Sequence, residues 1–243
     1  MQDKIERRIK KDAKKIAKYK DKYKGKRCFI IGNGPSLRME DLDRLHENKE
    51  ICFGSNKIYL AFGKTKWKPT FYTIQDVRDM NVYYSEIEKL KIKQKFVAYP
   101  YKIRQDFPIF KTFLAVELFF AHFFPYCPNF SDNPCVCIFE GWTVSYFNLQ
   151  LANYMGFKQI YLLGVDHSYA RYKSTDASIV VGEGRSYFTE EKYENRNLAE
   201  THKSTLGYIK AELFSRYHDF RIYNATRGGK LEAFERVNFD DLF

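Results

Sequence analysis

The sequence predicts an α/β fold in which a mainly parallel sheet is flanked by helices. Short apolar runs alternate along the chain with helical or long connecting segments, as in parallel sheets. The first run, Arg27–Ile31, ends in a glycine-rich turn at Gly32 to Ser36, and helical spacing resumes over Met39–Leu45. The order of strand, glycine-rich turn and helix opens many nucleotide-binding folds, so we expect a Rossmann-like domain.

A basic amphipathic helix precedes this first strand. Its apolar side chains fall roughly on one stripe of a Lys-rich segment: Ile5, Ile9, Ile16, Tyr19 and Tyr23. Gly25 stands at the expected C-cap. The sequence therefore predicts an N-terminal helix over residues 1–25, outside the main sheet, and one nucleotide-binding catalytic domain over residues 26–243.

Six further apolar runs are strand candidates. They are Glu50–Gly54, Thr70–Ile74, Lys95–Tyr99, Cys135–Phe139, Gln159–Leu163 and Arg221–Tyr223. Cys135 and Cys137 would share one face of their strand as core or edge thiols, because no second pair or nearby His cluster completes a zinc site. No metal site is predicted.

The connecting segments complete the expected fold. Thr143–Met155 has the length and apolar content of a buried helix, which Gly156 closes. Arg171–Glu194 is polar and without a sustained period, which predicts a long loop that could form a lid. Asn197–Tyr217 then reads as a helix.

Composition favours an anionic partner and a reducing compartment. Lys and Arg number 41 against 30 Asp and Glu, a formal net charge of +11, although much of the excess lies in the N-terminal helix. Five cysteines in a chain without a signal peptide indicate free thiols and a cytoplasmic location. The most apolar stretch, Phe113–Phe124, is shorter than the ~20 residues that span a bilayer.

The glycine-rich turn is the first candidate ligand site. Backbone amides in such a turn can approach a phosphate closely, and the following helix adds partial positive charge. Gly32, Asn33, Gly34 and Ser36 stand at these positions. The spacing matches neither the three-glycine dinucleotide pattern nor the lysine-bearing P-loop, and an ordinary tight turn is the alternative.

Polar residues also follow later strands, where open parallel sheets gather ligands. Asn56 follows the second expected strand, Gln75 and Asp76 follow the third, and Asp166 follows Gln159–Leu163. Each alone is ordinary loop chemistry, and Asp166 could simply cap its loop. Three consecutive strand ends with polar side chains favour nucleotide binding.

Three further candidate residues lie in the C-terminal part of the chain. His202, early in its expected helix, could remove a proton from an acceptor hydroxyl near neutral pH, with an ordinary surface histidine as the alternative. Asn224 and Thr226 belong to a segment that offers hydroxyl, amide and cationic groups to an anion, or forms a polar turn.

Several motifs together resemble two related families. They are Phe29–Leu37 (FIIGNGPSL), Thr143 before a helix ending at Met155-Gly156-Phe157, Ile160–Asp166 (IYLLGVD), His202, and Tyr223–Thr226 (YNAT) with Gly228–Leu231 (GGKL). One family comprises bacterial lipooligosaccharide sialyltransferases, which use CMP-activated sialic acid. The other is named for archaeal 6-hydroxymethylpterin diphosphokinase and includes motility accessory factors thought to transfer nonulosonic acids. The resemblance covers about residues 26–243.

The sialyltransferase resemblance implies a metal-free glycosyltransferase. Asn33 and Asn56 would contact the CMP moiety, Thr143 would hold the donor, and His202 would be the general base. The resemblance also implies two tyrosines that stabilise the departing phosphate. Tyr169 and Tyr172 are the nearest candidates, although their spacing from the aspartate departs from the family pattern.

The acceptor implied by this resemblance is a surface glycan or glycoprotein. The enzyme would work at the inner membrane face, where its basic helix would lie near anionic lipid. Self-association into a homo-oligomer is left open.

Two other functions remain open. A diphosphokinase would need Mg²⁺ and carboxylates to manage the charge of ATP, a task for Asp76 and Asp166. A nucleic-acid-binding protein would suit the charge and the aromatic content, but none of the usual single-strand or helix-turn-helix signatures is present, so no nucleic-acid partner is expected.

Overall fold

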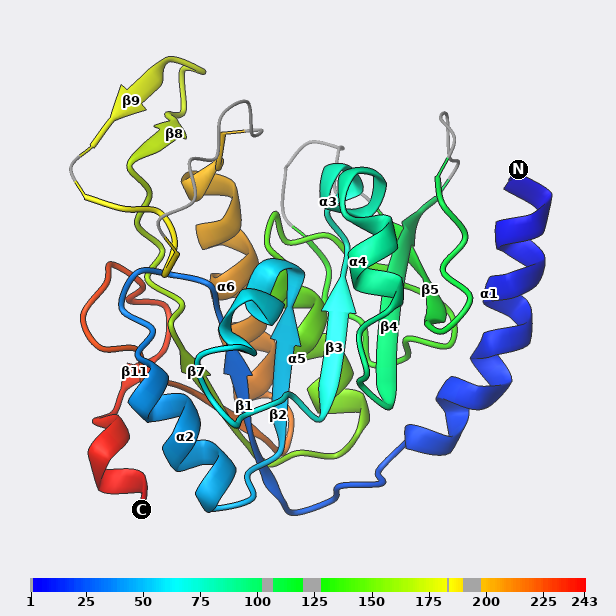
Figure 1. The fold of residues 1–243 in the computed structure, drawn as a ribbon, viewed down its shortest axis with the longest axis horizontal. Coiled ribbons are helices and arrows are strands. Elements are labelled where there is room, and N and C mark those ends of the chain that lie inside the picture. Colours follow the sequence, from blue (N-terminus) through cyan, green and yellow to red (C-terminus); the bar gives the residue numbers. More distant parts are fainter. Residues whose placement is uncertain (1, 102–106, 120–127, 183, 190–197) are drawn as a thin grey trace.

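The protein is built on one nine-stranded sheet in which every pairing is parallel (Figure 1). The computed structural model describes residues 2–101, 107–119, 128–182, 184–189 and 198–243. The strand order is β11-β10-β7-β1-β2-β3-β4-β5-β6. The strands are β1 Arg27–Ile31, β2 Cys52–Ser55, β3 Phe71–Ile74, β4 Gln94–Pro100, β5 Leu114–Phe119, β6 Ile138–Phe139, β7 Gln159–Leu163, β10 Arg221–Asn224 and β11 Glu235–Arg236.

The order of the strands creates a switch point beside β1. From β1 the chain builds β2 to β6 outward in one direction, and then returns to place β7 on the other side of β1. Ile31 at the end of β1 pairs with Gly54 of β2 and with Leu163 of β7. The loops after β1 and β7 therefore leave the sheet side by side at the carboxyl ends of these strands, which is where open parallel sheets bind ligands.

Helices cover both faces of the sheet (Figure 1). On one face lie α2 Met39–Glu47, η2 Asn56–Ala61, α3 Val77–Val82 and α4 Tyr84–Glu88, and on the other α5 Val144–Tyr154 and α6 Thr201–Arg216. Side chains of β1 alternate between two core clusters: Cys28 and Ile30 join the cluster of α5, whereas Phe29 and Ile31 join that of α2. Burial on both faces explains the continuous apolar run of this strand.

The N-terminal helix packs on the sheet edge. Helix α1 (Gln2–Ile16) contacts β5, and Ile5 and Ile16 are each only 1% exposed. Asp12 of α1 is fully buried and forms ion pairs with Arg8 and, at 3.2 Å, with Lys15. The expected N-terminal helix is therefore confirmed, and the rest of the protein covers Ile5 and Ile16 of its apolar stripe.

This helix is also shorter than expected. Helix α1 ends at Ile16, and the 3₁₀ turn η1 (Ala17–Tyr19) follows. The next residues run along the end of α5, where the Tyr23 amide donates to the Met155 carbonyl at 2.8 Å. No helix in the described part of the chain is long and apolar enough to cross a membrane.

Two other expectations are corrected. Cys135 lies in a turn rather than in a strand, because Asn133 accepts hydrogen bonds from the Cys135 and Val136 amides at 3.2 and 3.0 Å. The expected loop from Arg171 contains a hairpin, β8 Arg171–Lys173 with β9 Ile179–Val181, paired antiparallel above the strand ends (Figure 1). Residues 183 and 190–197 of that loop and of the start of the following helix lie outside the described residues.

Candidate active site

A cleft of about 580 Å³ opens at the carboxyl ends of the strands, at the switch point. Its size is within the usual range for small-ligand sites. The loops after β1, β2, β3, β6 and β7 line it, together with β8 and the start of α6. Of the residues expected at the site, it is lined by Gly32, Asn33, Gly34, Asn56, Gln75, Asp76, Thr143, Asp166 and Tyr169.

The glycine-rich turn is held tightly against the loop after β7. The Gly32 amide donates to the Leu163 carbonyl at 2.8 Å, and the Gly34 amide donates to the Gly164 carbonyl at 2.9 Å. A Cβ atom at Gly32 would overlap the Gly164 carbonyl, and one at Gly34 would overlap the Asp166 carboxylate. Both glycines are therefore required by the close approach of two backbones.

Asp166 occupies the place expected for a phosphate. Its carboxylate accepts hydrogen bonds from the Ser36 amide at 3.2 Å and from the Ser36 hydroxyl at 2.8 Å. Burial raises the pKa of Asp166, while the Ser36 hydrogen bonds oppose that shift. The Gly32, Gly34 and Ser36 amides all donate to protein acceptors, so the glycine-rich turn and the loop after β7 form a clasp, and phosphate binding by this turn stays a prediction. Ser36 is not on the cleft lining.

Two amide side chains beside this clasp have unused acceptors. Asn33 Nδ2 donates to the Ser55 carbonyl at 3.2 Å, but Asn33 Oδ1 and Asn56 Oδ1 are buried without a hydrogen-bond partner in the described structure. Leaving a buried acceptor unsatisfied costs about 1–3 kcal/mol, so both oxygens are suited to a donor from a bound ligand. Lys57 and Arg78 also line the cleft.

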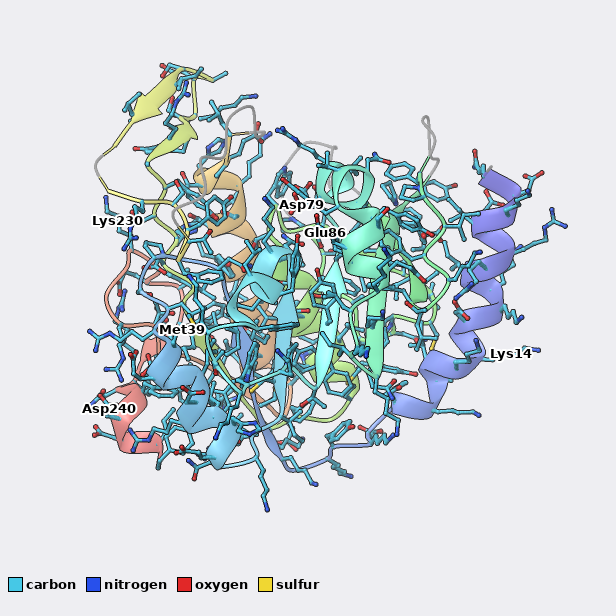
Figure 2. All side chains as sticks on the ribbon, in the orientation of Figure 1. Lys14, Met39, Asp79, Glu86, Lys230 and Asp240 are labelled. Carbon is cyan, nitrogen blue, oxygen red and sulfur yellow. The ribbon has the colours of Figure 1, made fainter. Side chains whose placement is uncertain are left out.

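Helix α3 and its capping residue bring two carboxylates to the cleft. Asp76 caps α3 by accepting a hydrogen bond from the Asp79 amide at 2.9 Å. Asp79 also lines the cleft, and Figure 2 shows it on the side of the molecule where the carboxyl ends of the strands lie. Gln75 and Asp76 thus lie at the cleft, where their position after a strand predicts them, although Asp76 also has a structural role.

The opposite end of the cleft contains a carboxyl group that the sequence did not single out. Glu140 follows β6 and lines the cleft with Trp142 and Thr143. Its Oε2 atom is buried and has no hydrogen-bond partner in the described structure. Burial raises the pKa of Glu140 to about 7, with Lys203 lowering it and Glu200 raising it further. The available signal was its place directly after a strand.

Thr143 belongs to a hydroxyl and imidazole network at this end. It caps α5 by accepting from the Ser145 amide at 3.3 Å, and its hydroxyl lies 3.3 Å from that of Tyr208. The Tyr208 ring meets His167 edge to face at 5.5 Å, and His167 Nε2 lies 2.7 Å from the Thr205 hydroxyl. Burial lowers the pKa of His167 and raises that of Tyr208. His167 and Tyr208 also line the cleft, and neither was predicted from the sequence.

Of the three residues implied as catalytic, Tyr169 lines the cleft, whereas Tyr172 and His202 do not. Tyr169 lines the cleft, and burial raises its pKa, which favours the protonated hydroxyl. Tyr172 lies on β8, bridged to Ala199, and is not on the lining. His202 lies in the first turn of α6, also off the lining, with its Nδ1 buried and lacking a hydrogen-bond partner in the described structure.

Asn224 and Thr226 lie beneath the cleft rather than on it. They are 1% and 5% exposed. Asn224 Nδ2 donates to the Leu231 carbonyl at 2.8 Å, and Thr226 Oγ1 accepts from the Val165 amide at 3.1 Å. In the structure these hydrogen bonds support the loop that carries Asp166, and ligand contact by Asn224 and Thr226 stays a prediction.

The cleft is not the most basic part of the molecule. Its described lining holds five carboxylates and three lysine or arginine side chains, namely Asp76, Asp79, Glu140, Asp166, Glu200, Lys57, Arg78 and Lys173. Among the described residues, no group of three or more His, Cys, Asp or Glu side chains is arranged to hold a metal ion. A Mg²⁺ ion that bridges nucleotide phosphates commonly takes only one or two carboxylates from the protein.

A second hollow of about 290 Å³ lies between the end of α1 and the start of β4. Five lysines dominate its lining: Lys15, Lys18, Lys22, Lys93 and Lys95. Lys95 is buried and donates to the Glu88 and Leu90 carbonyls at 3.0 and 2.9 Å, whereas Lys18 and Lys93 are exposed. This group of five lysines lies near the amino end of β4, at the opposite end of the sheet from the cleft.

Comparison with known proteins agrees with this fold. The structure is similar to a MAf glycosyltransferase from Magnetospirillum magneticum AMB-1, with a TM-score of 0.52 and 15% identity over 97% of this chain. The chain spans 39% of the length of that protein, and identity this low shows a shared fold. No curated protein matches the chain. Residues 4–172 match the family model described as 6-hydroxymethylpterin diphosphokinase MptE-like, and the chain therefore belongs to the MptE-like family.

Proposed function

We propose that this protein is a glycosyltransferase that moves a sugar from a CMP-activated nonulosonic acid to a hydroxyl group of a glycan or glycoprotein. The observation that carries the proposal is the cleft at the switch point, in which Asn33 and Asn56 present buried, unpartnered amide oxygens. Amide oxygens accept hydrogen bonds from amino and hydroxyl groups, both of which a cytidine nucleotide offers.

The chemistry of such a transfer fits the residues of the cleft. The transition state resembles an oxocarbenium ion, so the protein must stabilise the departing phosphate and remove a proton from the acceptor. The Tyr169 hydroxyl is kept protonated by burial and can donate to that phosphate. Lys57, Arg78 and Lys173 line the same cleft and supply positive charge for the anionic donor.

The comparisons support the general class of reaction. The family takes its name from a diphosphokinase and the structural neighbour is called a glycosyltransferase, and both names describe transferases. Both reactions pass an activated group to a hydroxyl acceptor. The choice of a CMP-sugar as donor rests on the motifs shared with sialyltransferases.

A diphosphokinase is the second candidate function, favoured by three carboxylates that line the cleft. Asp76, Asp79 and Asp166 all line it. Mg²⁺ is commonly bound by one or two carboxylates together with the phosphates of the substrate. Asp76 and Asp166 would hold the ion, which would screen the charge of ATP.

The products formed from each donor distinguish the two reactions. We expect the protein to release CMP from CMP-activated sialic acid, and to do so without added Mg²⁺. The double change Asn33→Ala and Asn56→Ala should weaken donor binding about tenfold or more, since each amide is expected to make a hydrogen bond worth about 1 kcal/mol. Release of AMP from ATP, dependent on Mg²⁺ and on a hydroxymethylpterin, would instead establish the diphosphokinase.

We further propose that contact with an anionic membrane uses the lysine-lined hollow. The apolar stripe of α1 is buried, so attraction would rest on charge alone, at about 1 kcal/mol for each lysine near the surface. Reversing two exposed charges with Lys18→Glu and Lys93→Glu should lower co-sedimentation with phosphatidylserine vesicles. Unchanged co-sedimentation would contradict this contact.

A further inference from the structure

One end of the cleft is built around acidic and aromatic side chains. We call it the acidic end and define it by Glu140, Trp142, Thr143 and Glu200, all of which line the cleft. Glu200 pairs with Lys203, whose ammonium group lies 5.5 Å from the centre of the Trp142 ring. The acidic end lies between the turn that joins β6 to α5 and the start of α6.

Close packing fixes the turn that carries Glu140. The Glu140 amide donates to the Phe119 carbonyl at 2.8 Å. Gly141 follows, and a Cβ atom there would overlap the Tyr146 ring. Gly207 of α6 approaches the same turn, since a Cβ atom at Gly207 would lie 2.9 Å from the Gly141 carbonyl oxygen. Both helices of this face therefore hold Glu140 at the cleft, as a catalytic group requires.

The Glu140 carboxyl group is left with unused hydrogen-bonding capacity. Its Oε2 atom is buried, and no described residue bonds to it. The charged groups that act on it are Lys203, which favours the carboxylate, and Glu200, which disfavours it. Burial is the largest cause of the shift and raises the pKa of Glu140 to about 7, so the group can accept or release a proton near neutral pH.

We infer that the acidic end is the subsite for the acceptor hydroxyl and that Glu140 is the general base of the transfer. The inference rests on the proposed function in requiring a hydroxyl acceptor. In the step, the acceptor oxygen forms a bond to the anomeric carbon of the donor while its proton moves to the Glu140 carboxylate. The bond between that carbon and the phosphate oxygen breaks, and CMP leaves with the electron pair.

The same assignment holds for either donor. A diphosphokinase would also need a base for its acceptor hydroxyl, and the attacked atom would then be phosphorus. The geometry favours Glu140 over His202 because Glu140 lines the cleft and His202 does not. Trp142 adds an aromatic surface against which a sugar or a pterin ring can pack.

The test compares Glu140→Gln with a matched control in the full chain. Glutamine keeps the size of the side chain but cannot take the proton. Glu117→Gln is the control, because Glu117 is also partly buried with a raised pKa, yet it interacts with Glu6 and Lys10 of α1 and is not on the cleft lining. The reaction measured is release of CMP from CMP-activated sialic acid with water as the acceptor, from pH 5 to 9.

We expect Glu140→Gln to lower kcat about 100-fold or more, with KM for the donor within about threefold of wild type. The wild-type rate should rise with pH through about 7, and this rise should vanish in the variant. Glu140→Asp should restore part of the rate, and CMP binding by each variant shows that it is folded. Glu117→Gln should behave as wild type.

The experiment distinguishes failure of the Glu140 assignment from failure of the proposed function. If wild-type protein releases CMP but Glu140→Gln does so at the same rate, the assignment of Glu140 is overturned and the proposed function stands. If wild-type protein turns over neither CMP-activated sialic acid nor ATP with Mg²⁺ and a hydroxymethylpterin, the proposed function itself is overturned.

Discussion

The two ends of the cleft differ in how their polar groups are satisfied. At the glycine-rich turn, the Gly34 amide and the Ser36 amide and hydroxyl already donate to the loop after β7. At the acidic end, Glu140 Oε2 is buried with no hydrogen-bond partner in the described part of the chain. The glycine-rich turn, which is the clearest motif in the sequence, thus uses its polar groups to hold two loops together. Glu140, which belongs to no motif, keeps an unused acceptor for a ligand.

The largest effect is expected at the glycine-rich turn. In Gly34→Ala the new methyl group would overlap the Asp166 carboxylate and lie 2.7 Å from the Gly164 carbonyl oxygen. The overlap should cost on the order of 1–3 kcal/mol of stability or more, and should weaken nucleotide binding at least tenfold because the two loops must separate. Gly63→Ala is the control, since nothing lies within 4 Å of its Cβ position. Chemical unfolding and calorimetry measure both effects, and equal behaviour of the two variants would contradict the clasp.

The next effect concerns stability at the acidic end. The pKa of Glu140 is raised from 4.5 to about 7 by burial, so the folded chain holds a proton that the unfolded chain releases. This term therefore lowers stability as pH rises between these values. Glu140→Gln should be more stable than wild type at pH 8, by about 1–3 kcal/mol, with a smaller difference at pH 5.

Urea unfolding at both pH values measures this difference. A gain that is the same at pH 5 and pH 8 would show that Glu140 keeps an ordinary pKa.

The smallest effect is expected at His202, which lies beside the acidic end without lining the cleft. His202→Ala should lower kcat for CMP release by less than about tenfold, against about 100-fold for Glu140→Gln. The reverse order would restore the general-base role that the resemblance to sialyltransferases implies. Parallel kinetic assays of the two variants decide between the residues.

Much of the fold could be predicted because its signals are local. The expected strands Arg27–Ile31 and Gln159–Leu163 agree with β1 and β7 at both ends. Each is buried on both faces and bounded by turn residues, so the apolar run coincides with the strand. The predicted Rossmann-like architecture is confirmed by the parallel sheet and its flanking helices.

The parts that were missed depend on tertiary contacts. Strand β5 was seen only as an apolar stretch, and whether such a stretch forms a strand is decided by pairing with β4 and β6. One side of helix α1, with Ile5 and Ile16, is buried because the helix packs against β5, which its basic composition does not reveal.

The position of a residue after a strand predicted much of the cleft lining, whereas the hydrogen bonds of these residues could not be predicted from the sequence. Residues after strand ends, such as Asn56 and Gln75, do line the cleft. Asp166 and Thr226 carry polar groups that the protein itself uses, which only the three-dimensional structure reveals. Glu140 was not singled out although it directly follows an expected strand, because the charges that act on it, Glu200 and Lys203 at the start of α6, are distant in sequence.

The most direct test of the account is calorimetric binding of CMP, CDP, ATP and GTP to the purified protein, each with and without Mg²⁺. The account predicts that CMP binds most tightly, that Mg²⁺ changes its affinity little, and that Asn33→Ala with Asn56→Ala weakens it. Binding of ATP that requires Mg²⁺, with no measurable affinity for CMP, would contradict the proposed glycosyltransferase.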